Sequence, residues 1–337
     1  MLARPAFVAA LAMAALLALS AACTNGGGGS DDGRLRVVTT VSPITSLAEN
    51  IGGTKIQLQG LIPEGVNSHT YEPPVSDVRV LADADLIIMN GLKLEEPTLE
   101  LAEANKQADA VILLVGEETL TPAEYKYDFS FPESEGKPNP HLWPNPALSL
   151  EYATLIHDKL VLLDPDNANY YDANFQELKR RLEALDEAMR TAAATVPEEN
   201  RRLLTYHDSW AYWADRYGFQ VIGAIQPSDF AEPSAKEVAD LIDQVKKEGV
   251  PAIFGSEVFD SPVLEQIASE TGAEYVDDLR DDDLPGEPGG DLHSYIGLMS
   301  QNMRIMMPAL GGDASAVDAV DTGLVFNDGP SPANYPQ

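Results

Sequence analysis

The stretch LRVVTTVSP, residues 35–43, decides the fold. Its first seven residues are rich in β-branched side chains and contain no turn former, which predicts a buried strand. Ser42 and Pro43 then begin a helix, and the pair Gly52 and Gly53 ends it. A strand that leads directly into a helix is the unit from which parallel, two-sided α/β sheets are built.

The same unit recurs along the chain in two series. Further strands are predicted at 56–62, 85–90 and 110–115, and then at 202–206, 221–225, 252–255 and 274–276. Between the series, residues 164–193 carry apolar side chains at three- and four-residue spacing, which predicts a helix roughly 40 Å long. The expected fold class is therefore α/β, with two Rossmann-like lobes whose parallel sheets are joined by a long backbone helix.

The N-terminus is typical of an export signal. A positive Arg4 precedes an apolar run at 6–19, which is too short to span a bilayer stably. Cys23, the only cysteine, stands where a bacterial lipoprotein is cleaved and lipidated, although Ser20 occupies a place where a larger aliphatic residue is usual. The alternative is an ordinary secretory cleavage site with an incidental cysteine. A Gly-rich polar tether follows, so we expect a body anchored to the membrane outside the cytoplasm.

These patterns give a set of expected boundaries. They are a signal peptide at 1–22, a lipidated flexible tether at 23–34, an N-terminal α/β lobe at 35–163, the linking helix at 164–195, a C-terminal α/β lobe at 196–311 and a flexible tail at 312–337. The net charge of −32 disfavours nucleic acid and anionic lipid as partners. With a single cysteine, the exported fold has no internal disulfide and depends on its core.

Three of the five histidines, His69, His141 and His207, lie at nearly even intervals, each just after a predicted strand or at the start of a loop. Asp277 and Asp278 follow the last predicted strand. Because ligands gather at the carboxyl ends of parallel strands, we expect a metal site in the cleft between the lobes. Asp277 is the expected fourth ligand and Asp278 its rival.

Three imidazoles and one carboxylate suit Zn²⁺ and leave no open coordination position, which favours capture of the ion over catalysis. Affinity is expected to fall as the histidines are protonated below about pH 6.5. Glu72, Asp208 and Asn139 are candidates to orient the imidazoles. His157 is expected to be a surface or satisfied core residue, and the run 281–283 to be a solvated loop. His293, which precedes the last predicted helix, is expected to have a capping or surface role, with a place near the cleft as the alternative. The three tryptophans are expected to be packing residues.

Four motifs carry a resemblance to a known family. They read SHTYEPP at 68–74, NGLKLE at 90–95, NPHLW at 139–143 and TYHDSWAY at 205–212. The chain resembles the zinc- and manganese-binding lipoproteins of ABC importers, the cluster A-I solute-binding proteins, over most of residues 35–310. It departs from the family pattern at Asn139, where Asp is usual, and it lacks the His-rich loop of many zinc members.

The resemblance implies two lobes with limited hinge motion, and metal delivery to a membrane permease that a cytoplasmic ATPase powers. His207 at the third ligand position implies zinc, because manganese members usually have Glu there. We therefore expect a monomeric Zn²⁺-binding protein, not an enzyme, with an ABC permease as its partner; loading by a metallochaperone stays open. The alternatives are a manganese-binding homologue, a metal-dependent surface adhesin, and an exported zinc hydrolase, which the absence of a His-Glu-x-x-His motif disfavours.

Overall fold

In the computed structural model, the first lobe is built on a sheet of five parallel strands in the order β4-β3-β1-β2-β9. The structure describes residues 33–226, 233–258, 262–277, 279–331 and 333–336. The strands are β1 Leu35–Thr39, β2 Ile56–Gly60, β3 Leu86–Met89, β4 Val111–Leu114 and β9 Ala333–Asn334. Within β1, Val37 and Val38 are almost completely buried, in agreement with the β-branched run at 35–41.

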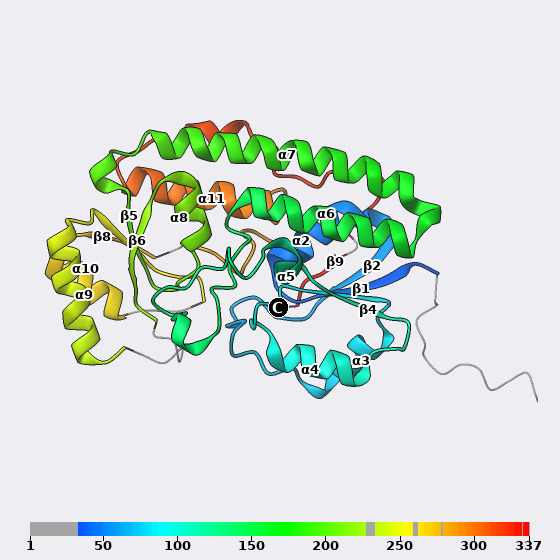
Figure 1. Cartoon of the computed structure of the whole chain (residues 1–337). Helices are drawn as coiled ribbons and strands as arrows, with labels where there is room; N and C mark the ends of the chain where they lie inside the picture. The colour runs from blue at the N-terminus through cyan, green and yellow to red at the C-terminus, as the bar shows by residue number, and fades with distance from the viewer. Residues whose placement is uncertain (1–32, 227–232, 259–261, 278, 332, 337) are drawn as a thin grey trace, which may run out of the picture. The chain divides into compact units, whose positions relative to one another are not determined.

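Helices flank the sheet of the first lobe, with α2 and α6 on one side and α3 and α4 on the other (Figure 1). They are α2 Ser42–Gly52, α3 Val75–Asp83, α4 Glu96–Asn105, α5 Val115–Thr119 and α6 Pro146–Leu163. Every residue of α2 is buried, because this helix packs on β2 and also on α6 and the linking helix. The short helix α5 begins directly where β4 ends.

The second lobe is built on four parallel strands in the order β6-β5-β7-β8. Its elements are β5 Arg202–Thr205, α8 Ala211–Tyr217, β6 Gln220–Ala224, α9 Ala235–Glu248, β7 Ala252–Phe254, α10 Pro262–Thr271 and β8 Glu274–Val276. The strands are short, and a register shift between Leu203 and Leu204 interrupts the pairing of β5 with β6. Two parallel α/β sheets confirm the predicted fold class.

Two long helices join the lobes. Helix α7, Ala168–Ala194, packs on α2 and α6 of the first lobe and on α8 of the second, and Figure 1 shows it passing both sheets. Its buried face repeats at three- and four-residue spacing, as the sequence predicted; this face includes Phe175, Leu178, Leu182, Leu185 and Met189. Helix α11, Tyr295–Ala309, contacts α7, α2 and β8.

The expectation of a flexible tail at 312–337 is wrong for most of that segment. The chain returns to the first lobe, where β9 pairs with β2 and Asn334 donates to the Gln59 side chain. The hydroxyl of Tyr335 donates to the buried carboxylate of Glu49, which Ser331 also contacts. A composition rich in Gly, Asp and Pro suggested disorder, but these long-range hydrogen bonds give the tail a fixed place.

Residues 1–32 lie outside the described part, so the signal peptide and Cys23 stay predictions. Among the described residues, no helix is both long enough and apolar enough to cross a bilayer. The three tryptophans, Trp143, Trp210 and Trp213, are buried in the main core, as expected of packing residues.

Candidate metal centre

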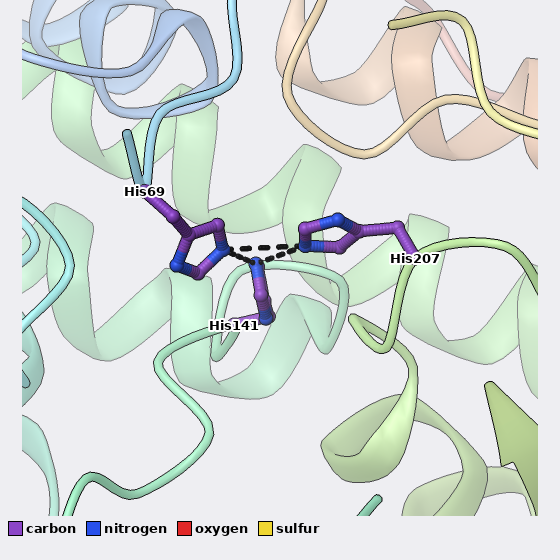
Figure 2. Close-up of side chains that lie close together, drawn as sticks. All are labelled: His69, His141 and His207. Atoms are coloured by element: carbon purple, nitrogen blue, oxygen red, sulfur yellow. Dashed lines mark hydrogen bonds between the residues drawn. The ribbon is translucent and has the colours of Figure 1, made fainter. Parts of the chain in front are cut away.

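Three imidazoles from distant parts of the chain meet at one point. His69 lies in the loop between β2 and α3, His141 lies just before α6, and His207 follows β5. Figure 2 shows their rings pointing toward one another. The Nε2 of His141 is 3.1 Å from the Nε2 of His69 and 2.9 Å from that of His207, and the remaining Nε2 pair is 3.3 Å apart. The structure therefore brings the three predicted histidines together.

These separations are close to what a zinc ion requires. Tetrahedral Zn–N bonds of about 2.0–2.1 Å hold two ligating nitrogens about 3.3–3.4 Å apart. The observed distances of 2.9–3.3 Å are slightly shorter. Three nitrogens that face one another at this distance are poorly satisfied by neutral rings alone, and a cation between them would accept all three lone pairs.

Asn139 fixes the ring of His141. Its side-chain oxygen lies 2.8 Å from Nδ1 of His141 and also accepts the backbone N–H of that residue at 3.0 Å. Since the oxygen is an acceptor, Nδ1 carries the proton and Nε2 presents its lone pair to the centre. The Asn139 amide nitrogen donates in turn to Asp128 and to the backbone oxygen of Asp208. Asn139 thus performs the orienting role despite its departure from the family pattern.

The other two orienting candidates behave differently. The Asp208 carboxylate accepts the backbone N–H of Ser130, so it braces the surrounding loop instead of contacting an imidazole. Burial, and then the charge of Asp128, raises its pKa. Glu72 is exposed at the surface.

Burial keeps the three imidazoles neutral. His141 and His207 are buried and His69 is partly buried. Desolvation lowers the pKa of His207 to about 4. Desolvation, followed by the charge that a neighbouring imidazolium would carry, holds the pKa of His69 and of His141 well below the usual value. At neutral pH all three rings are in the form that binds metal, and their protonation is shifted below the pH of 6.5 that the sequence suggested.

The carboxylate beside the imidazoles is Asp281, not Asp277. One Asp281 oxygen lies 3.7 Å from the Nε2 of His207, and Asp281 and Asp282 form a cluster of potential ligands with His141. The same Asp281 oxygen is buried and has no hydrogen-bond partner, which is the condition of an oxygen that a cation would satisfy. Asp277 is exposed and belongs to neither cluster of potential ligands among the described residues. Asp278, its rival, is not among the residues that the structure describes.

The run 281–283, which together with Arg280 forms the acidic loop (residues 280–283), was expected to be solvated, and this expectation is wrong. Asp281, Asp282 and Asp283 are each less than 9% exposed. Burial is the first cause of a pKa raised well above normal for Asp281, to about 8 for Asp282 and to about 6 for Asp283. Sequence reasoning placed the ligand directly at the end of β8. The run of three acids four residues after Asp277 is the signal that could have pointed to a carboxylate beside the imidazoles.

The remaining histidines lie elsewhere. The ring of His157, on α6, contacts Asp158 and Asp172 at the surface, as expected for a structural residue. His293 is only 3% exposed, which corrects the expectation of a surface role, and its ring packs edge-on against Tyr335. Neither residue belongs to a cluster of potential ligands in the described ranges.

Comparisons with known proteins agree with this geometry. The model of the family described as "ZnuA: Zinc-uptake complex component A periplasmic" matches residues 37–309. The high-affinity zinc uptake system protein ZnuA of Bacillus subtilis is 31% identical over 309 residues, which cover 88% of this chain and 96% of that relative. The manganese-binding lipoprotein MntA of Halalkalibacterium halodurans is 29% identical, covering 84% of this chain and 91% of the relative.

Among solved structures, the periplasmic zinc-binding protein TroA of Treponema pallidum is similar with a TM-score of 0.75 and 27% identity. That match covers 82% of this chain and 99% of the other. A manganese-bound periplasmic metal-binding protein of Candidatus Liberibacter asiaticus matches with a TM-score of 0.70 and 25% identity, over 82% of this chain and 100% of the other. Relatives named for different metals thus share the architecture.

Proposed function

Because this chain belongs to the ZnuA family of metal-binding subunits of ABC importers, we propose that it captures Zn²⁺ outside the cytoplasm and delivers it to its membrane permease. The family consists of extracytoplasmic substrate-binding proteins and not of enzymes. Zn²⁺ is here the cargo. The proposed ligands are Nε2 of His69, His141 and His207 and a carboxylate oxygen of Asp281.

The observation that carries the choice of zinc is the donor set. Three imidazole nitrogens within 3.3 Å of one another, with an Asp281 oxygen 3.7 Å from one of them, would supply the four donors of a tetrahedral zinc site. Mn²⁺ prefers more oxygen ligands and a larger coordination number than this set offers. Four protein ligands also suit transport of the ion better than catalysis, because they leave no coordination position for a reacting water.

Manganese is the second candidate, because relatives named as manganese-binding are nearly as similar to this chain as those named for zinc. A competition experiment separates the two. The metal-free protein is mixed with equal concentrations of Zn²⁺ and Mn²⁺ in excess, washed free of unbound metal and analysed by mass spectrometry of the elements. We expect about one Zn²⁺ per chain; retention of Mn²⁺ in its place, or of neither ion, contradicts the proposal.

Anchoring at Cys23 completes the proposed role. A lipid chain on this residue, followed by the tether at 24–34, would hold a monomeric body beside its permease. Metabolic labelling of the producing cells with a fatty acid is expected to mark the protein, and Cys23→Ser is expected to abolish the label and release the protein from membranes. A wild-type protein that takes up no label argues for an ordinary secretory leader, and equal labelling of the Ser variant means that the lipid is not attached at Cys23.

A further inference from the structure

We infer that Glu257 is a positioning residue, which shapes the acidic loop so that Asp281 faces the three imidazoles. The inference rests on the proposed function, since it concerns the fourth ligand of the same centre. Glu257 lies in the loop that follows β7, at the carboxyl end of the second sheet. Nothing in the motifs of the sequence marks it, and its role follows from its contacts.

One carboxylate oxygen of Glu257 accepts three consecutive backbone N–H groups. The donors are the amides of Asp281, Asp282 and Asp283, at 2.9, 3.1 and 3.1 Å. Consecutive amides can point at one oxygen only if the backbone curls into a concave turn around it. The Glu257 carboxylate therefore acts as the core of the turn from which the Asp281 side chain projects.

The start of the acidic loop is held by α11. The side chain of Asn302, which is fully buried, accepts the backbone N–H of Arg280 at 3.0 Å and donates to its carbonyl oxygen at 2.6 Å. With Asn302 on Arg280 and Glu257 on the next three amides, the backbone of the loop is fixed at four successive residues. These contacts come from the second lobe and from α11, not from the loops that carry the histidines.

The acidic loop also contacts the two loops that carry His69 and His141. Asp282 accepts the hydroxyl of Ser68 at 2.6 Å, beside His69, and Asp283 accepts the backbone N–H of Gly65 at 2.7 Å. The indole of Trp143, two residues after His141, donates to the backbone oxygen of Asp281 at 2.7 Å. A displaced turn would therefore move Asp281 relative to the loops that carry His69 and His141.

Glu257 is not itself in the ligand set. Neither cluster of potential ligands among the described residues contains it, and its Oε1 is occupied by the three amides. The turn requires an acceptor oxygen at the right distance, which a glutamine amide also supplies. An aspartate at this position keeps the negative charge, but its shorter side chain moves the acceptor oxygen away from the three backbone amides. Glutamine and aspartate therefore separate a positioning role from a general effect of negative charge.

The test measures Zn²⁺ affinity by competition with a chelating dye for the purified wild-type protein and for single variants. We expect Glu257→Ala and Glu257→Asp to weaken binding by about 10- to 100-fold, in the range of other groups that orient metal ligands. Glu257→Gln is expected to stay within about threefold of wild type because it restores the acceptor. Glu265→Ala, which removes an exposed acid from α10, is the matched control and is expected to have no effect.

A double variant shows whether Glu257 acts through Asp281. Once Asp281→Asn has removed the ligand, adding Glu257→Ala is expected to cost less than about threefold further, whereas independent effects would multiply. Circular dichroism and thermal unfolding of the metal-free variants report whether each is folded. If Glu257→Ala does not fold, the comparison of Glu257→Gln with Glu257→Asp decides.

The outcomes distinguish this inference from the proposed function. If the wild-type protein binds no Zn²⁺, both fail. If it binds Zn²⁺, and the folded Glu257 variants bind it equally well or the aspartate variant binds better than the glutamine variant, only the positioning role is overturned. Full multiplication of the two effects in the double variant overturns it too.

Discussion

The metal centre has an imidazole side, formed by His69, His141 and His207, and a carboxylate side, formed by the acidic loop, and burial acts on the two in opposite ways. Desolvation lowers the pKa of the imidazoles, which leaves them neutral and ready to bind at neutral pH. The same desolvation raises the pKa of the acids at 281–283, whose charged forms are costly without a cation. The imidazoles are therefore already in their metal-binding form before the ion arrives, whereas the charged form of the carboxylates is stabilised only when the ion is bound.

The largest effect is expected from His141→Ala. The Nε2 of His141 lies within 3.1 Å of both other Nε2 atoms. Its removal leaves only two imidazole nitrogens to coordinate the ion. Zn²⁺ retained per chain after washing is expected to fall from about one to near zero. His157→Ala removes a histidine outside the centre and is expected to retain the metal. Full retention by the His141 variant would mean that the imidazole side is not the binding site.

A smaller effect is expected from the residue that orients this imidazole. Asn139→Ala removes the acceptor of the His141 Nδ1 proton, and Zn²⁺ affinity is expected to fall by about 10- to 100-fold. Asn139→Asp keeps an acceptor oxygen and is expected to bind nearly as tightly as wild type. Competition titration measures both, and equal affinity of the alanine variant contradicts the orienting role.

The carboxylate side predicts a pH dependence of stability in the metal-free protein. Glu257 and Asp282 have a pKa of about 7 and about 8 when folded, mainly through burial, and normal acidic values when unfolded. Between pH 7 and 8 the folded state therefore holds more protons, so the free energy of unfolding falls as pH rises, by on the order of 1 kcal/mol per pH unit. The histidines oppose this fall near pH 6.5, where they are partly protonated only in the unfolded state, and their opposing contribution fades as the pH approaches 8.

Denaturant titrations at pH 7, 7.5 and 8 measure this slope, with and without Zn²⁺. The bound ion replaces the protons as the neutralising partner, so zinc loading is expected to flatten the slope. A metal-free protein that gains stability over this range would contradict the account of the carboxylate side.

The smallest effect on binding is expected from Asp282→Asn. Asparagine keeps an acceptor for the Ser68 hydroxyl and removes an acid that is held partly protonated. Zn²⁺ affinity is expected to change by less than about threefold, while the pH slope of the metal-free protein becomes shallower, because residue 282 no longer releases a proton over this range. A loss of affinity as large as that of Asp281→Asn would make Asp282 the ligand.

The sequence predicted the fold well where local patterns determine it. The β-branched run at 35–41, the strand–helix alternation and the apolar spacing along α7 each correspond to an observed element. The tail could not be predicted, because it is ordered by partners far along the chain, such as Glu49 for Tyr335. Local composition carries no information about such partners.

The same distinction applies to the site. Each histidine lies in a motif, and the structure brings all three together. The carboxylate was misplaced because the chain continues past β8 before it turns inward, and that turn is set by Glu257 and Asn302, which are distant in sequence from the motifs. Three consecutive acids suggest a solvated surface, and only their tertiary contacts reveal that they are buried.

The most direct measurement is a crystal structure of the zinc-loaded protein with anomalous data collected on both sides of the zinc absorption edge. The account predicts a single strong anomalous peak at about 2.0–2.2 Å from the Nε2 atoms of His69, His141 and His207 and from a carboxylate oxygen of Asp281. A peak coordinated by other residues, or no peak among these imidazoles, would contradict it.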